Sequence, residues 1–199
     1  MIRFFDVLFS ILGLILLSWL FIIIFILIKL DSKGPIFYFQ ERIGKDGIPF
    51  KLFKLRSMYV DVDKRGLQIT VGKRDPRITR VGYFIRKYKI DELVQLVNVI
   101  KGEMSLVGPR PEVKKYVDLY TPEQRIVLSV KPGITDYASI KFRNENELLE
   151  GQPDPEKFYI EKIMPEKIEL NLIYIKSYNI INYMNIVYMT ILGVLSRRK

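Results

Sequence analysis

The longest hydrophobic run of the chain lies near its N-terminus. From Val7 to Ile28 the sequence contains no charged residue. A run of this length is enough to cross the hydrocarbon core of a bilayer as one helix. A secretory signal is the competing interpretation, but no small-residue cleavage site follows the run. We therefore predict a membrane-anchoring helix over residues 1–30.

The charges that flank this run are positive on both sides. Arg3 precedes it, and Lys29 and Lys33 follow it. Because positive residues favour the cytoplasmic face, a simple span with these flanks has no preferred orientation. A re-entrant helix, which enters and leaves on the cytoplasmic face, would place both flanks on the favoured side. Gly13 and Ser18 are the points where such a helix could bend,, and the residues alone leave both topologies open.

The next segments have the pattern of a β-hairpin followed by helices. Two partly apolar stretches, 36–44 and 48–58, flank a turn signal at Asp46-Gly47,. Apolar residues at helical spacing then predict one helix over residues 80–90 and a second over 91–100,. The basic side chains of the first helix, which remain for water or for phosphate, are Arg80, Arg86, Lys87 and Lys89.

The C-terminal segment, about residues 168–196, is apolar enough to be mistaken for a second span. Polar residues interrupt it at every third position: Lys176, Asn179, Asn182 and Asn185. Because such groups are costly in hydrocarbon, we predict an amphipathic helix in the membrane interface, with a buried core helix as the alternative. The expected fold is α+β: a membrane-embedded helix on a small, mostly helical domain, residues 31–199, with a short β-hairpin.

Composition limits the chemistry that this domain can perform. The 199 residues include no cysteine and no histidine, and the formal net charge is +10. Thiolate nucleophiles, thiolate zinc sites and Ser-His triads are therefore excluded, and acid–base chemistry falls to Asp, Glu, Lys or Tyr. The positive charge predicts an anionic partner, which could be nucleic acid, acidic lipid or a phosphorylated substrate.

The first candidate for chemistry is the pair Asp91-Glu92, at the start of the second predicted helix. Carboxylates in this position ordinarily complement the helix dipole and cap free amides. The functional interpretation is a carboxylate that attacks phosphorus or holds a divalent metal beside a diphosphate. Adjacent helical residues point about 100° apart, so the two carboxylates need not share one role.

The second candidate is Arg110, between Pro109 and Pro111 in the sequence SLVGPRPE. An arginine on so stiff a backbone suits bidentate phosphate recognition, although an exposed arginine in a turn is the simpler alternative. The Pro-Gly turn of KPGIT, residues 131–135, is by itself most simply a structural turn,.

Taken in order, these segments resemble the bacterial sugar transferase family, the monotopic polyprenol-phosphate phosphoglycosyl transferases. The resemblance runs from about Arg3 to Asn144. The matching elements are the apolar helix, DSKGPIFYFQERIG, FKLFKLRSM, IDELVQLVNVIKGEMSLVGPRPE and KPGIT. The block from IDEL to GPRPE is highly specific. The chain lacks the large N-terminal extension of longer members, so the resemblance implies the minimal catalytic form.

The resemblance implies a two-step reaction at the cytoplasmic face of the bacterial inner membrane. Asp91 would attack the β-phosphate of a UDP-sugar and expel UMP, and polyprenol phosphate would then take the phosphosugar from the aspartyl intermediate. Glu92 would assist beside Asp91 in metal or proton handling. Mg²⁺, with Asp91 as its protein ligand, would neutralise the diphosphate and the leaving group.

The family pattern also implies a set of cations for the substrate anions. These are Arg110 for phosphate, with Arg86, Arg143, Lys54 and Arg56 in support. The implied partners are the donor, the polyprenol phosphate acceptor and the bilayer. No nucleic acid is expected, and a homo-oligomer is left open.

Three positions depart from the family pattern. Ser18 is followed by Trp19, where the family has a proline that turns the membrane helix back. Asp136 to Ser139 replace a Gly and a Gln-containing stretch. Asn182 and Tyr183 stand where an Asp is common. No catalytic role is assigned to the last two regions.

Two other function classes compete with this assignment. A membrane-bound polybasic adaptor would explain the charge, the anchor and the C-terminal helix, but it has no need of the Asp-Glu pair or of GPRP. A polytopic-type transferase without a covalent intermediate would need more membrane spans than this sequence contains.

Overall fold

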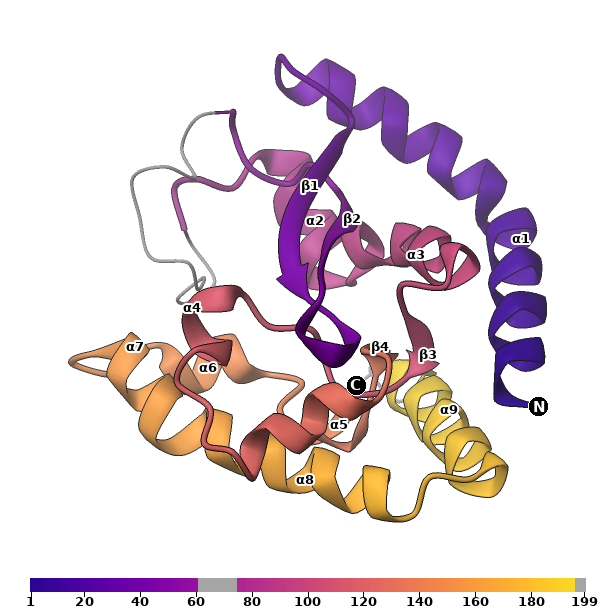
Figure 1. Ribbon diagram of the computed structural model, residues 1–199. Helices are drawn as coiled ribbons and strands as arrows, with labels where there is room; N and C mark the ends of the chain where they lie inside the picture. The colour runs from indigo at the N-terminus through magenta and orange to yellow at the C-terminus, as the bar shows by residue number, and fades with distance from the viewer. Residues whose placement is uncertain (61–74, 196–199) are drawn as a thin grey trace.

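The computed structural model describes residues 1–60 and 75–195 (Figure 1). Its N-terminal half contains α1 (Ile2–Asp31), β1 (Phe37–Ile43), β2 (Pro49–Leu55), α2 (Arg80–Lys87), the 3₁₀ segment η3 (Ile90–Gln95), α3 (Leu96–Lys101) and β3 (Ser105–Val107). Its C-terminal half contains α4 (Lys114–Val117), the 3₁₀ segment η4 (Gln124–Ser129), β4 (Gly133–Thr135), α5 (Tyr137–Lys141), α6 (Glu145–Leu149), α7 (Pro155–Phe158), the π-helical turn η5 (Tyr159–Ile163), α8 (Met164–Lys176) and α9 (Ile180–Leu195). The predicted mixture of helices and small sheets is confirmed.

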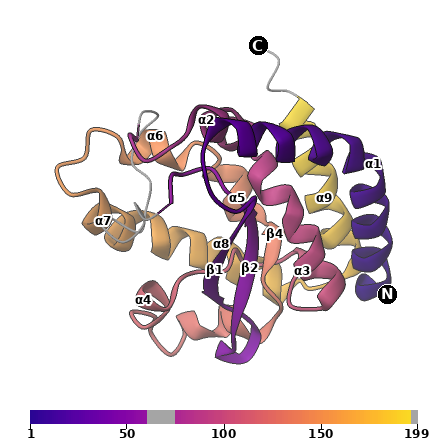
Figure 2. The same cartoon turned by 90° about the horizontal axis from the view of Figure 1, so that it is seen from above.

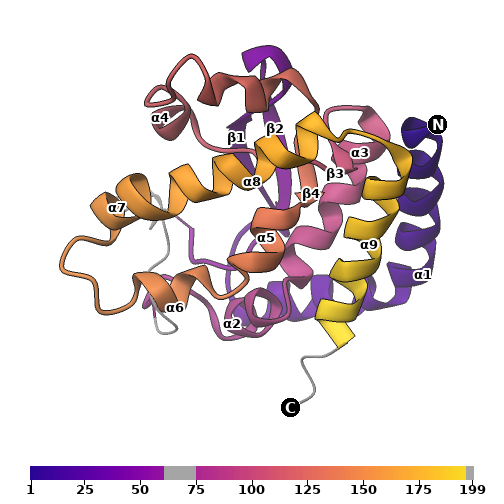
Figure 3. The same cartoon turned by 90° about the horizontal axis from the view of Figure 1, so that it is seen from below.

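Helix α1 is long and apolar enough to cross a membrane, as the sequence predicts. Most of its large side chains are exposed to the surroundings, among them Leu16, Trp19 and Ile22. The buried core helix of a soluble protein would not expose so many apolar side chains. The helix lies on the outside of the molecule beside α2 and α3, and it bends about midway along its length (Figures 1 and 3).

Both ends of α1 are attached to the rest of the protein by hydrogen bonds. At the start, Arg3 donates to the carbonyl oxygens of Val99 and Ile100 at the end of α3. At the end, the Asp31 carboxylate accepts from the backbone N–H of Val81 at 2.9 Å. In the first half, Gly13 allows α1 to approach Leu96 closely, because a Cβ atom there would lie 3.1 Å from a Leu96 methyl carbon.

The predicted β-hairpin is confirmed. Strands β1 and β2 are antiparallel, with Phe37 opposite Leu55 and Ile43 opposite Pro49, and Asp46 has the positive φ of 57° that a tight turn requires,. The buried side chain of Asn98 in α3 fixes this hairpin from behind. It accepts from the backbone N–H of Phe53 and donates to the backbone carbonyl of Lys51 and the carboxylate of Glu103.

A second, parallel pair of strands was not predicted. Strand β3 pairs with β4, with Ser105 opposite Gly133 and Val107 opposite Thr135. The two backbone segments are so close that a Cβ atom on Gly133 would lie 2.1 Å from the backbone nitrogen of Gly108. This pair brings the GPRP sequence and the KPGIT sequence side by side, so the Pro-Gly turn is part of the same support.

The single C-terminal helix expected over about residues 168–196 is instead two helices, α8 and α9 (Figure 3). They are separated where the carbonyl of Ser177 accepts bonds from the side chains of Asn179 and Asn182, while the Asn179 side chain accepts from the Asn182 N–H. Two of the polar residues that interrupt this segment, Asn179 and Asn182, thus lie where one helix ends and the next begins,. The basic end of the chain, residues 196–199, lies outside the described residues.

A buried aspartate joins α1 to β3 and α9. Asp6 is 2% exposed, and one of its oxygens accepts from Ser105 Oγ, the Leu106 N–H and the Tyr183 hydroxyl, each at 2.9 Å. Burial and the neighbouring Asp6 charge raise the pKa of Tyr183, so its proton stays in place as a donor. Three segments distant in sequence therefore depend on one carboxylate.

Removal of this carboxylate should destabilise the fold more than loss of any one of its donors. We expect Asp6→Ala to lower the free energy of unfolding by about 2–3 kcal/mol, because three buried donors lose their acceptor, and Tyr183→Phe by about 1 kcal/mol. Denaturant unfolding in detergent micelles measures both. The control is Glu169→Ala on the exposed side of α8, which should stay within about 0.5 kcal/mol of wild type,. An Asp6→Ala value no larger than this control would contradict the role given to Asp6.

Candidate active site

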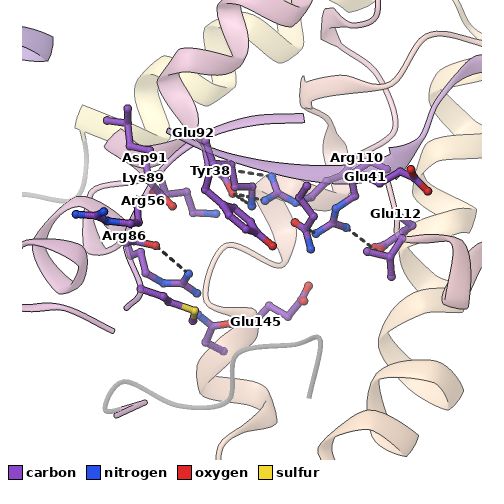
Figure 4. A pocket seen from close by; sticks show the side chains of 18 of the residues that line it. Tyr38, Glu41, Arg56, Arg86, Lys89, Asp91, Glu92, Arg110, Glu112 and Glu145 are labelled. Carbon is purple, nitrogen blue, oxygen red and sulfur yellow. Dashed lines mark hydrogen bonds and ion pairs between the residues drawn. The ribbon is translucent and has the colours of Figure 1, made fainter. Parts of the chain in front are cut away.

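A cavity of about 890 Å³ opens between the hairpin, the α2–η3 turn and the GPRP sequence (Figure 4). Its walls carry more cations than carboxylates. The cations include Lys54, Arg56, Arg86, Lys89, Arg110 and Arg143, and the carboxylates include Asp91 and Glu92. Every residue that the sequence predicts for the site therefore lines one space.

The local chain path explains why Asp91 and Glu92 face this cavity. Helix α2 begins with a side-chain cap, since Thr79 Oγ accepts from the Gly82 N–H at 2.9 Å, and it ends at Tyr88. Lys89 then adopts a left-handed conformation, and the chain turns into η3. The carboxylates lie in the first turn of η3, but neither makes a capping hydrogen bond with its side chain. Their position in the first turn still complements the helix dipole, but no capping hydrogen bond accounts for the pair,.

Glu92 is held by two cations. Arg110 binds it with both terminal nitrogens, Nη1 to Oε2 at 3.0 Å and Nη2 to Oε1, and Lys54 Nζ donates to Oε1 at 3.3 Å (Figure 4). Burial alone would raise the pKa of Glu92. The charges of Arg110 and Lys54, with the hydrogen bonds from Arg110, outweigh burial and hold this pKa well below its usual range,. Glu92 is therefore a fixed, ionised group.

Asp91 has the opposite environment. Its residue is 5% exposed, yet its carboxylate makes no hydrogen bond or ion pair within the described residues. Burial and the charge of Glu92 raise the pKa of Asp91 to about 6, against the opposing effect of Lys54, Arg86 and Arg110. An unbound carboxylate that ionises near neutral pH is suited to nucleophilic attack.

Arg110 is mounted on a loop that is fixed from three directions. Its backbone N–H donates to Asp136 at 3.2 Å, and the carbonyl of Pro109 accepts from the Gly133 N–H at 2.9 Å. From the hairpin side, Arg42 donates to the carbonyl of Pro111 at 3.0 Å. The guanidinium is consequently presented by a rigid backbone, not by an exposed turn.

The remaining predicted cations differ in what else they do. Arg86 lies across the cavity from Arg110 and donates to Ser57 Oγ at 3.4 Å (Figure 4). Arg143 lines the cavity and also donates to the carbonyl of Gly193 in α9. Arg56 is 5% exposed and donates to the carbonyls of Ile28 and Ser32, so it ties one wall of the cavity to the end of α1.

The residue profile of one family covers almost the whole chain. The profile described as "Bacterial sugar transferase" matches residues 1–197. The chain belongs to the bacterial sugar transferase family. The family inferred from the IDEL and GPRP segments is thereby confirmed.

Relatives of this bacterial sugar transferase carry related names with different sugars. A putative undecaprenyl-phosphate N-acetylgalactosaminyl 1-phosphate transferase of Bacillus subtilis is 48% identical over 121 residues, which are 61% of this chain and 67% of that protein. A UDP-glucose:undecaprenyl-phosphate glucose-1-phosphate transferase of Klebsiella pneumoniae is 39% identical over 191 residues, 94% of this chain and 38% of that protein. A third relative is the UDP-N-acetylgalactosamine-undecaprenyl-phosphate N-acetylgalactosaminephosphotransferase of Aeromonas hydrophila. It is 41% identical over 138 residues, 68% of this chain and 32% of that protein. This transferase thus matches only about a third of the two longer relatives.

Several residues of the site were not predicted as functional. Tyr38 projects into the cavity from β1, and Arg42 and Glu112 form an ion pair at its far side (Figure 4). Asp136, at a position where the transferase departs from the family pattern, supports Arg110. Which side chains of β1 face the cavity depends on the hairpin register. Apolar and polar residues alternate only weakly along these strands, so the sequence did not define that register.

The Glu92–Arg110 pair should show strong energetic coupling. In a double-mutant cycle with Glu92→Gln and Arg110→Gln, we expect a coupling free energy of about 1–3 kcal/mol, because each single change takes the bidentate partner from a partly buried charge,. Chemical denaturation of the four proteins gives this value. The exposed pair Lys114–Asp118 on α4 is the matched control and should give at most about 0.5 kcal/mol,. Equal coupling in the two cycles would mean that the Glu92–Arg110 pair contributes no more than a surface ion pair.

Proposed function

We propose that this protein transfers a phosphosugar from a UDP-sugar to a polyprenol phosphate and releases UMP. The observation that carries the proposal is the unbound carboxylate of Asp91, set beside a Glu92 that Arg110 and Lys54 immobilise, in a cavity lined by cations. The names of the family relatives support the same reaction class, a sugar 1-phosphate transfer to undecaprenyl phosphate.

In the first step a carboxylate oxygen of Asp91 attacks the β-phosphorus of the donor. A bond forms between this oxygen and phosphorus, and the bond from phosphorus to the bridging oxygen breaks, so that UMP leaves with the bonding electrons. Arg110 and Arg86 are placed to bind the charged phosphate oxygens in this step,. The product on the enzyme is an aspartyl phosphosugar.

In the second step a phosphate oxygen of the polyprenol attacks the phosphorus of this adduct. The Asp91 carboxylate leaves, and the product is a polyprenol diphosphosugar. Glu92 stays ionised throughout, because its two cationic partners stabilise the charged form. Its role is to hold Arg110 and Lys54 in place and to keep a negative charge next to Asp91, which raises the energy of the ionised nucleophile.

The residues present fit Mg²⁺ bound mainly by substrate. Within the described residues, no group of three or more Asp, Glu, His or Cys side chains could form a metal site by itself. Mg²⁺ commonly binds through one or two carboxylates and substrate phosphates while keeping several waters, and Asp91 is the free carboxylate that could contribute. When bound, the ion would neutralise charge on the diphosphate.

We also propose that α1 is re-entrant and that the catalytic domain, residues 31–199, lies on the cytoplasmic face of the inner membrane. Both ends of α1 are bonded to the same body, through Arg3 at one end and Asp31 at the other. The helix also bends midway (Figure 2). The basic flanks, with Lys29 and Lys33, favour the cytoplasmic side at both ends,. This placement keeps the cavity within reach of an acceptor phosphate at the membrane surface.

The assignment of Asp91 is tested with a panel of UDP-sugars, polyprenol phosphate and Mg²⁺. We expect the wild-type protein to release UMP from at least one donor, and Asp91→Asn to reduce that rate at least about a thousandfold, because an amide does not form the covalent adduct. Asp118→Asn, an exposed carboxylate outside the cavity, is the control and should keep wild-type turnover.

Two results would contradict parts of this proposal. Turnover that survives in Asp91→Asn would exclude Asp91 as the nucleophile while retaining the enzyme. Absence of UMP release from every donor, in folded protein whose binding to anionic vesicles disappears at high salt, would favour the polybasic adaptor.

The raised pKa of Asp91 predicts a pH dependence. Attack requires the ionised carboxylate, and the pKa is raised to about 6, so kcat/KM should fall as the pH is lowered through about 6,. Glu92→Gln removes a negative neighbour and releases Arg110 and Lys54, and all of these changes favour ionised Asp91. The acid limb should therefore move to lower pH, whatever the absolute rate. The control Glu169→Gln, on the exposed side of α8, should leave the acid limb at its wild-type pH. An acid limb of Glu92→Gln that stays at the wild-type pH or moves to higher pH would refute this account of the Asp91 pKa.

A further inference from the structure

Lys89 stands in a conformation that does not suit a lysine. It has φ 55° and ψ 26°, the left-handed region. Among the described non-glycine residues, only Asp46 in the hairpin turn shares a positive φ. Glycine and asparagine adopt this region more readily than lysine.

The same residue is also a poor helix cap. Lys89 precedes the first residue of η3, a position where Ser, Thr, Asp or Asn normally accepts a bond from a backbone N–H, and its side chain makes no such bond,. Both the left-handed backbone and the cap position therefore disfavour lysine here. A residue that conflicts with its local structure in a site is a candidate for a functional role.

The side chain of Lys89 enters the cavity next to Asp91 (Figure 4). Lys54 and Arg110 also line this cavity, but both already donate hydrogen bonds to Glu92. Across the described ranges, 1–60 and 75–195, the Lys89 ammonium makes no hydrogen bond or ion pair. The carboxylates of Glu92, Glu145 and Asp91 act on this charge without direct contact, so the ammonium remains available to a ligand.

We propose that Lys89 is a substrate-binding residue whose ammonium contacts a phosphate group of the substrate. The inference rests on the proposed phosphosugar transfer and adds to it a cation that the motif-based set of Arg86, Arg110, Arg143, Lys54 and Arg56 does not contain. Its ligand is an anionic phosphate oxygen, which either the nucleotide donor or the polyprenol phosphate acceptor can supply. The charge is held two residues before the nucleophile Asp91, where the reacting phosphorus must arrive.

The test compares Lys89→Asn with Lys89→Arg in full-length protein in lipid nanodiscs. Asparagine suits both the left-handed backbone and the cap position, so the unfolding temperature of Lys89→Asn should equal or exceed that of wild type. Its KM for the phosphate-bearing substrate should rise about tenfold, the effect of losing one charge-assisted hydrogen bond, while kcat changes less. Lys89→Arg, which keeps the cation, should restore most of this loss. Lys162→Asn removes an equal charge from the exposed surface of η5 and should leave KM unchanged.

Separate measurements identify the source of the phosphate and isolate this inference from the reaction itself. A rise in the donor KM with weaker UMP binding would place the contact on the nucleotide, and a rise in the acceptor KM alone would place it on the lipid phosphate; either result supports the role. If the wild type released no UMP but bound it more tightly than Lys89→Asn did, the proposed reaction would fail and the phosphate site would stand. Unchanged KM values and unchanged UMP affinity in Lys89→Asn would overturn the inference, as would a loss that Lys89→Arg fails to restore.

Discussion

The arrangement of the site depends on the ion pair between Glu92 and Arg110. Glu92 comes from η3, Arg110 from the loop after β3, and Lys54 from β2, so one carboxylate joins three elements. Charges removed from water require partners, and here the partners are themselves fixed by the backbone. Because Glu92 satisfies these cations, Asp91 can remain without a partner in the same cavity. Two adjacent carboxylates thus have different protonation behaviour, one strongly ionised and one ionising near neutral pH.

The apolar helix α1, which is long and apolar enough to cross a membrane, is also part of the folded body. Its first turns carry Asp6, which holds β3 and α9, and its last turn offers the Ile28 carbonyl to Arg56. Strand β3 leads directly into the Gly108–Arg110 loop. The position of α1 is therefore linked through a few buried polar contacts to the loop that carries Arg110, the arginine proposed to bind phosphate. Such contacts are directional, so they set the register of α1 against the body more closely than its apolar packing does.

The sequence was most informative where residue type and chemistry coincide. Asp91, Glu92 and Arg110 could be identified because acidic and Pro-flanked basic residues in this order have few other uses. It was least informative for long-range pairing. Strands β3 and β4 have three residues each, too few for a periodic pattern. Their pairing depends on the close approach of the Gly108 and Gly133 backbones, which are distant in sequence. The division of the C-terminal segment at Ser177 depended on asparagine side chains bonding to backbone, and polar spacing alone suggested an interfacial face instead. Asp6 lies just before the uncharged run and has no recognisable partner in sequence, since Ser105 and Tyr183 are neutral.

Much of the positive charge behind the net charge of +10 lies at the cavity. Many of the cations line the cavity, and only part of their charge is balanced there by carboxylates such as Glu92 and Glu112. An excess of cations in a concave, partly desolvated space favours the entry of anions, so the cavity is electrostatically suited to phosphate. Arg56 then explains why the membrane matters to this site. The same guanidinium lines the cavity and binds the end of α1, so the proposed phosphate site adjoins the end of the apolar helix. The proposed acceptor, with its phosphate at the membrane surface and its tail in hydrocarbon, would meet both environments at that junction.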